Sequence, residues 1–385
     1  MATPLDRLVR KEVSLGAIRE LQPPQQHIGL RLVPWLDVDS DDVIFDYIKG
    51  GLQDGLAPAR AEDAEAELSQ KDELLYGAGR ASIIDWSQKD RYTASDVTRY
   101  REDLFIQQQL QGANTSLAFN SNARAVQQFQ SRLARDDAAR KRRLDNRIEW
   151  LIMSGLFNGQ IAYNDGKIKF TVNYGRPSDQ QSIAPASGLW DPATNLDDMD
   201  PIGDILAVRK TIYDRTGVYP TRGILSQKIV DNLWRSPRFL AAAGIPVVGG
   251  NPNVPLDPNY LGLAGYTPEG ALRIVEQATK VKFEVYDAVY RTRALGSTSY
   301  TNVRFSDERD ILLLPGDGDL GEIDDTLVGF GKTLTSPHPE GNWSSGFYEW
   351  EDESRDPWMH VRGSGVKAFP VLPYLEYTAT LRVLA

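Results

Sequence analysis

The sequence predicts an α+β protein in which one long helix connects parts built from short strands and loops. The first observation is the stretch 124–157, which has no proline and no glycine before Gly155. Its apolar residues recur at helical spacing, first from Val126 to Leu133 and again from Leu144 to Leu151. The other two observations are strand-like runs on both sides of this stretch and a compact helix–strand–helix segment after residue 200. The predicted helix, about residues 123–157, would be on the order of 45 Å long at 1.5 Å per residue.

The middle of this helix, from Arg135 to Arg143, is almost wholly charged or alanine. Such a segment is too polar for the interior of a globular domain, so we expect it to face water or another chain. The helix would then behave as a strut that is buried at both ends. A long amphipathic helix with one ordinary solvated face is the alternative interpretation.

Composition indicates a globular protein and excludes several classes of site. The 385 residues are 41% apolar and 25% charged, and the net charge is -10. A protein whose main task is to grip nucleic acid or an anionic membrane needs clustered positive charge instead. Cysteine is absent, which excludes disulfides and thiolate chemistry. The first 20 residues lack the pattern of a signal peptide, and no apolar run is long enough to span a membrane.

The first part of the chain predicts an arm and a long excursion. Residues 1–41 carry several prolines and little periodicity, which favours an extended arm. Alternating residues predict strands over 41–50 and 77–90, and the segment between them is polar, acidic and short of apolar anchors. We interpret the two strands and the segment between them as a long projecting hairpin or loop; a disordered surface loop is the alternative. A helix over 93–113 follows, with Thr93 or Ser95 as its N-cap.

The second part predicts a hairpin, a small α/β region and a final strand. Asn164-Asp165-Gly166 separates two apolar runs and is a strong hairpin signal. Asp200 and Gly217 have the residue types of an N-cap and a C-cap around a helix, and a strand RGILS and a second helix QKIVDNLWRSP follow. Alternation then predicts strands in ALRIVEQ, KFEVYDAVYRT, ILLLPG and TLVGFGKTL, and a last strand over 374–383 that docks in a sheet.

No motif supports catalysis, so we name no catalytic, cofactor-binding or metal-ligating residue. The three histidines are widely spaced, and no Gly-x-Ser-x-Gly elbow is present. Residues 316–321 match Gly-x-Gly-x-x-Gly, but the acidic residues around them would repel a pyrophosphate. We expect the acidic runs 317–325 and 349–358 to be solvated loops. A hydrolase that uses carboxylates from 317–325 or 349–356 stays open as an alternative, because paired carboxylates need no histidine.

The order of these parts resembles the major capsid proteins of tailed bacteriophages with the HK97 fold, most closely the family of the lambda major head protein. The resemblance is carried by RRLDNRIEWLIMSGLFNGQIAY at 142–163, KFTVNYGRP at 169–177, the tract 189–233, and FYEWEDESRDPWMHVRGSGVKAFPVLPYLEYTATLRV at 347–383. It implies five parts, which are an N-terminal arm (1–41), an E-loop (42–92), a peripheral domain with the spine helix (93–189), an inserted axial domain (190–335), and a return to the peripheral domain that ends on the C-terminal strand (336–385).

The resemblance also implies a function and a set of partners. Subunits of that family form pentamers and hexamers of an icosahedral shell that encloses double-stranded DNA without specific binding. Portal and scaffolding proteins are then expected partners, a decoration protein is an optional one, and no membrane is involved. The protein would be assembled in the host cytoplasm and reside in the virion. An encapsulin-type compartment shell is the alternative within the same fold. The residues that we expect at contacts between subunits are Ile44, Phe45, Ile83, Trp86, Arg140 and Arg143.

Overall fold

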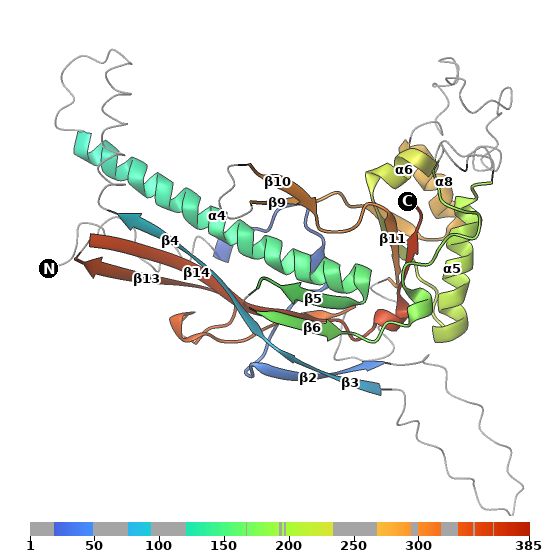
Figure 1. Cartoon of the computed structure of the whole chain (residues 1–385), viewed down its shortest axis with the longest axis horizontal. Helices are drawn as coiled ribbons and strands as arrows, with labels where there is room; N and C mark the ends of the chain where they lie inside the picture. The colour runs from blue at the N-terminus through green and yellow to red at the C-terminus, as the bar shows by residue number, and fades with distance from the viewer. Residues whose placement is uncertain are drawn as a thin grey trace, which may run out of the picture.

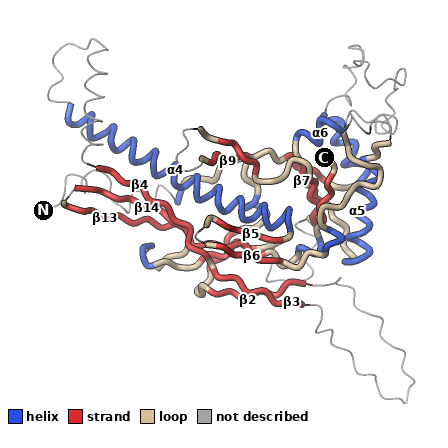
Figure 2. Tube along the Cα trace, in the orientation of Figure 1, coloured by secondary structure: helices blue, strands red, loops and turns tan. Residues whose placement is uncertain are grey.

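The body of the protein is organised along helix α4 (Ser121–Asn158), which is 38 residues long and confirms the predicted helix. A strand-rich part lies beside this helix, and a part with shorter helices lies at its C-terminal end (Figures 1 and 2). The computed structural model describes residues 19–48, 76–93, 121–166, 168–191, 195, 198–233, 268–293, 299–316, 330–341, 343–356 and 358–385.

The largest sheet has five strands around β14, in the order β1-β12-β14-β13 with β4 on the other side of β14. Only the β1–β12 pair is parallel. A Cβ atom at Gly363 would lie 2.2 Å from the Trp350 ring of the neighbouring strand, so the absence of a side chain at Gly363 lets that ring lie across β14. The strands are β1 (Trp35–Asp37), β4 (Ile84–Thr93), β12 (Lys332–Thr335), β13 (Phe347–Arg355) and β14 (Trp358–Val371).

Strand β13 corrects the prediction that 349–358 is an acidic loop. Nine residues of β13 pair with β14, and Glu351 lies directly across from Arg362. Opposite charges at facing positions stabilise a strand pair. The acidic residues of this segment alone would suggest a solvated loop. The other acidic run, 317–325, lies outside the described residues, as does most of the glycine motif at 316–321.

The charged middle of α4 also differs from the prediction. Asp137, Arg140 and Lys141 are each at most 5% exposed, although we expected this segment to face water or another chain. The reason is that oppositely charged partners on α4 itself and on strands β4 and β14 compensate the loss of hydration. Arg135 and Arg142 on the opposite side of the helix are exposed.

The excursion begins with a separate two-stranded hairpin. Strands β2 (Asp42–Ile48) and β3 (Tyr76–Ser82) are antiparallel, as predicted, and pair only with each other within the described residues. The strand predicted over 77–90 is divided at Ile83, because β3 belongs to this hairpin and β4 to the main sheet. The chain therefore rejoins the body at Ile84, before the expected end of the excursion at 92. The predicted polar segment 51–75 and the predicted helix 93–113 lie outside the described residues, apart from Thr93.

Two small hairpins flank α4. Strands β5 (Gln160–Asn164) and β6 (Lys169–Asn173) confirm the predicted turn, in which Gly166 has a φ of 83°. Strands β9 (Val289–Thr292) and β10 (Thr301–Arg304) form the other. The predicted strand KFEVYDAVYRT is therefore two strands in different sheets, since its first half is β8 (Lys282–Val285).

Within the described residues, the α/β region is a four-stranded sheet, ordered β15-β11-β7-β8, with three α-helices. Asp200 caps the first helix by accepting a hydrogen bond from the Gly203 N–H at 3.0 Å, and Gly217 ends it at a φ of 75°, as predicted. The elements are α5 (Pro201–Thr216), β7 (Arg222–Leu225), α6 (Gln227–Leu233), α8 (Pro268–Thr279), β8, β11 (Asp310–Leu314) and β15 (Ala379–Arg382).

The prediction of a strand in ALRIVEQ is wrong, because these residues lie in α8. Leu272 and Ile274 give the segment an alternating pattern and are partly buried, but the fully buried residues are Ala271 and Val275, four positions apart. A spacing of four is helical. A segment of seven residues is short enough to fit both the two-residue period of a strand and the 3.6-residue period of a helix.

The C-terminal strand docks in a sheet as predicted, but in a different one. β15 pairs with β11 in the α/β region, whereas we expected it in the domain of the long helix. It is also shorter, because a 3₁₀ turn over Leu375–Tyr377 precedes it. The neighbouring strand β11 separates two cores: Leu312 and Leu314 face the core under α4, and Ile311 and Leu313 face the core of the α/β region.

Candidate functional site: the charged side of helix α4

The structure divides the six residues predicted at subunit contacts into three groups. Ile83 and Trp86 are 7% and 8% exposed and belong to the core under α4. The indole of Trp86 packs edge-on against Tyr163 and donates a 3.1 Å hydrogen bond to the Ala368 carbonyl. These two side chains are therefore occupied within their own chain.

The other four predicted residues lie on two elements. Arg140 and Arg143 are three positions apart on α4, and the first is fully buried while the second is exposed. Ile44 and Phe45 lie in strand β2, where the structure describes the backbone alone. The structure therefore brings Trp86 and the two arginines to the region where α4 meets β4 and β14, and it leaves the β2 pair on the projecting hairpin.

Arg140 is the centre of a buried network between α4 and the main sheet. Its guanidinium donates to Asp137, to Asp90 at 2.6 Å and to the Ser364 hydroxyl at 3.0 Å. Glu349 lies 3.9 Å away and accepts a hydrogen bond from Ser364. Burial opposes the charge of Arg140, but the carboxylates of Asp137 and Asp90 raise its pKa above the ordinary value. The guanidinium is therefore held as a cation inside the protein.

The network continues along β14 through Arg362, which is also buried. Its guanidinium lies 3.4 Å from Asp137 and 3.3 Å from Glu351. The second arginine thus shares Asp137 with Arg140. Carboxylates and guanidinium groups alternate across the interface between the helix and the sheet, and the removal of one charge would leave its partners buried without compensation.

Lys141, the residue after Arg140, forms a buried ion pair with Asp145 one turn further along α4. The ammonium of Lys141 also lies 4.0 Å from the centre of the Phe347 ring. Burial raises the pKa of Asp145, and the adjacent ammonium opposes that rise. This pair continues the charged interface of α4 toward the arm.

Glu149 joins three parts of the chain. Its carboxylate is fully buried and accepts hydrogen bonds from the backbone N–H groups of Ile28 and Gly29, at 3.1 and 3.0 Å, and from the Tyr286 hydroxyl at 2.7 Å. A Cβ atom at Gly29 would lie 2.5 Å from the carboxylate, so only glycine permits this approach. Burial raises the pKa of Glu149, and the hydrogen bonds oppose that rise. Glu149 therefore fixes the arm and the α/β region to α4.

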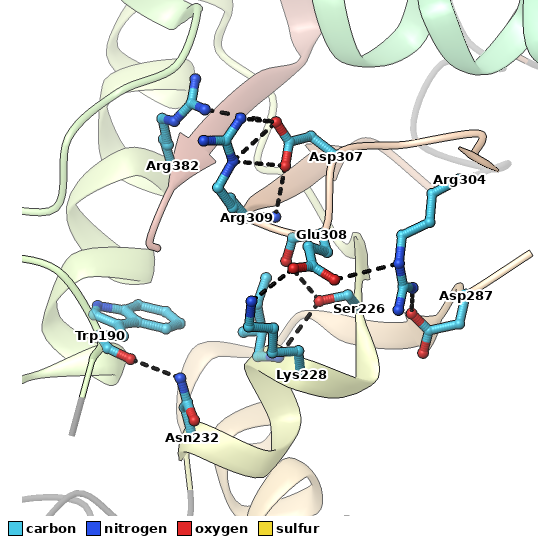
Figure 3. A network of polar contacts seen from close by, with 11 residues as sticks. Trp190, Ser226, Lys228, Asn232, Asp287, Arg304, Asp307, Glu308, Arg309 and Arg382 are labelled. Carbon is cyan, nitrogen blue, oxygen red and sulfur yellow. Dashed lines mark hydrogen bonds and ion pairs between the residues drawn. The ribbon is translucent and has the colours of Figure 1, made fainter. Parts of the chain in front are cut away.

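A second charged cluster lies on the surface of the α/β region (Figure 3). Asp307 contacts Arg309 at 2.6 Å and Arg382 at 3.5 Å, and Glu308 contacts Lys228 at 2.6 Å and Arg304 at 3.3 Å. The hydrogen bonds from Arg309 lower the pKa of Asp307. These side chains are between about a third and a half exposed, so solvent screens the pairs and each contributes little to stability.

Neither charged region resembles a metal centre. Among the described residues, no group of three or more His, Cys, Asp or Glu side chains could hold a metal ion. None of the described helices has the length and hydrophobicity needed to cross a membrane. Sequence reasoning did not predict the Glu149 and Arg362 contacts, because their partners lie more than 100 residues away or on strands that it did not recognise.

The fold is similar to that of solved phage capsid proteins. The crystal structure of the putative capsid protein of a prophage from E. coli CFT073 matches with a TM-score of 0.53 at 14% identity, over 100% of this chain and 99% of that chain. A phage-related protein from Bordetella bronchiseptica RB50 matches with a TM-score of 0.47 at 14% identity, over 96% of each chain. The match to the prophage capsid protein confirms the predicted fold class, a mixed helix-and-strand fold of the HK97-like capsid type.

The family follows from the sequence itself. The chain belongs to the phage major capsid protein E family, whose sequence model matches residues 15–319. A comparison with curated proteins finds no match. The protein is therefore a phage major capsid protein, a component of the virion shell that associates with copies of itself.

Proposed function

We propose that this chain forms the pentamers and hexamers of an icosahedral shell that encloses packaged double-stranded DNA. The family match over residues 15–319 supports a shell, and the resemblance described above supports the capsomer types and the DNA. The proposed role is structural rather than catalytic. In an icosahedral shell each weak contact is repeated many times, so that modest pairwise affinities stabilise the closed particle.

The observation that carries this proposal is the hairpin β2–β3. It pairs with no other described strand, and it projects from the body at the side opposite α4 (Figure 1). An isolated two-stranded hairpin is marginally stable in water, and it gains stability by packing against a second surface. We propose that the hairpin, together with residues 49–75, docks on a neighbouring subunit and that Ile44 and Phe45 contribute to that contact.

The other predicted contact residues change role in this proposal. Ile83, Trp86 and Arg140 hold their own subunit together through the contacts described above. Arg143 is exposed and stays available to another molecule. Portal and scaffolding proteins are proposed partners, a decoration protein is a further one, and the host cytoplasm is the proposed place of assembly.

Electron microscopy tests the proposal directly. The protein would be expressed alone and together with a scaffolding protein encoded beside it, and examined by negative-stain microscopy and light scattering. Closed shells, or free pentamers and hexamers, are the expected result. A monodisperse monomer or dimer under both conditions would contradict it. Replacement of Ile44 and Phe45 by serine should reduce assembly while the unfolding midpoint of the subunit stays the same.

A further inference from the structure

A basic groove follows one side of α4. It has a volume of about 910 Å³ and is formed by β4, by the segment of α4 between Arg143 and Trp150, and by described residues of the β5–β6 and β9–β10 hairpins. Figure 1 shows these two hairpins on either side of the helix. The groove therefore lies between the strand-rich body and the β9–β10 hairpin, which follows β8 of the α/β sheet.

Five cationic side chains line this groove. They are Lys89, Arg143, Arg147, Arg291 and Arg293. Four of them are exposed, and Arg147 is half-buried. Within the described part of the chain, none of the five has a carboxylate within ion-pair distance, whereas Arg140, Arg304 and Arg309 each contact at least one. The protein has a net charge of -10, so the groove is a local excess of positive charge on an acidic protein.

Three of these cations are held in place by neutral partners. Arg147 lies over the rings of Trp86 and Tyr163, at 5.2 and 5.1 Å from the ring centres. Arg143 donates to the Gln88 side chain at 3.4 Å, and Arg293 lies 5.5 Å from the centre of the Tyr300 ring. A guanidinium that stacks on an aromatic ring keeps its N–H donors free at its edges. The groove thus positions cations without neutralising them.

The two carboxylates in the groove are engaged with other groups. Asp85 accepts a hydrogen bond from the Tyr348 hydroxyl. Asp165 accepts one from the Tyr163 hydroxyl at 3.1 Å and one from the Ile168 N–H at 2.7 Å. These hydrogen bonds serve the main sheet and the β5–β6 turn. Even with both carboxylates counted, cations outnumber anions among the lining residues.

We propose that this groove binds the phosphate backbone of the DNA inside the shell, without reading its sequence. Arginine fits phosphate oxygens through paired N–H donors, and a row of cations on one groove is the usual footprint of backbone recognition. The inference rests on the proposed function, because the enclosed DNA is the polyanion that every subunit of a filled shell would meet. It adds a defined contact to a protein whose overall negative charge repels DNA elsewhere.

The experiment measures DNA binding by the unassembled full chain, whose state is checked by light scattering. A fluorescently labelled 20-base-pair duplex of arbitrary sequence is titrated at several salt concentrations and followed by anisotropy. The groove variant is Arg143→Gln/Arg291→Gln/Arg293→Gln. The matched control is Arg135→Gln/Arg142→Gln/Lys210→Gln, which removes the same charge from exposed positions outside the groove. Circular dichroism and unfolding midpoints confirm that both variants are folded.

The expected result is salt-dependent binding that the groove variant weakens about 10-fold or more at low salt, while the control stays within about twofold of the wild type. The slope of log K against log salt should fall by about 0.9 for each phosphate contact removed. Equal losses in both variants, or no binding by the folded wild type, would overturn the inference. Preferential binding of a peptide with the acidic sequence of residues 60–75 would overturn it as well, in favour of contact with another copy. Assembly is measured separately, so a chain that forms shells but does not bind DNA contradicts only this inference.

Discussion

Arg140 and Arg143 are one turn apart on α4 and have opposite environments. Arg140 is fully buried, and Asp137, Asp90 and Ser364 accept hydrogen bonds from its guanidinium. Arg143 is exposed in the basic groove, where Gln88 is its hydrogen-bond partner. Arg140 thus stabilises its own subunit, whereas Arg143 is available to another molecule. For these two arginines, burial with paired carboxylates indicates a structural role, and exposure in the groove leaves the cation available for binding.

Removal of the buried cation should have the largest effect. Arg140→Gln would leave Asp137, Asp90 and Glu349 without their main counter-charge, and we expect a loss of about 3–5 kcal/mol in the free energy of unfolding. Urea denaturation of the full chain measures this loss. Arg143→Gln is the matched control and should change stability by no more than about 0.5 kcal/mol. Similar losses for the two variants would remove the distinction between the two environments.

Glu149 tests the connection between the arm and α4. Glu149→Ala would leave two backbone N–H groups and the Tyr286 hydroxyl buried without an acceptor, which should cost about 2–4 kcal/mol. Glu149→Gln keeps one acceptor oxygen and should cost less. Amide hydrogen exchange at Ile28 and Gly29 should accelerate in the alanine variant more than global unfolding explains. Unchanged exchange there would show that the arm is held by other contacts.

From the lowered pKa of His27 we predict that the stability of the protein decreases in acid. Burial, with a smaller contribution from Lys141, lowers the pKa of His27 to about 4. A lowered pKa in the folded state means that its stabilising contribution is present above the ordinary pKa of about 6.5 and is lost as the pH falls toward 4. Because the ring is partly exposed, we expect a loss on the order of 1 kcal/mol. The unfolding midpoints of the wild type at pH 7 and pH 5 should therefore differ more than those of His27→Gln, and equal differences would contradict the assignment.

The surface cluster of Figure 3 should show the smallest effect. Arg304→Gln removes contacts with Asp287 and Glu308, all of them partly exposed, so we expect a loss below about 1 kcal/mol that decreases further at high salt. Denaturation at low and high salt measures both. A loss as large as that of Arg140→Gln would show that exposure does not separate the two kinds of ion pair in this protein.

The sequence by itself determined the elements whose signals are local. The apolar spacing of 124–157, the turn residues at 164–166, and the caps Asp200 and Gly217 each predict a structure that depends on neighbours within a few positions. The structure confirms all three. The two-stranded start of the excursion and the family resemblance also came from sequence, because both depend on the order of segments along the chain.

Only the tertiary structure decided which charges are buried and which strands share a sheet. Arg140 has a partner 224 positions away, and nothing near it in the sequence indicates that Ser364 will lie there. The sequence of residues 349–358 predicts a solvated loop, but in the structure Arg362 of β14 lies across from Glu351. The segment ALRIVEQ fits both the strand and the helix period, and the burial of Ala271 and Val275 shows that it is helical. The physical reason is that desolvation and pairing depend on atoms brought together by folding, whereas periodicity and caps depend on the chain alone.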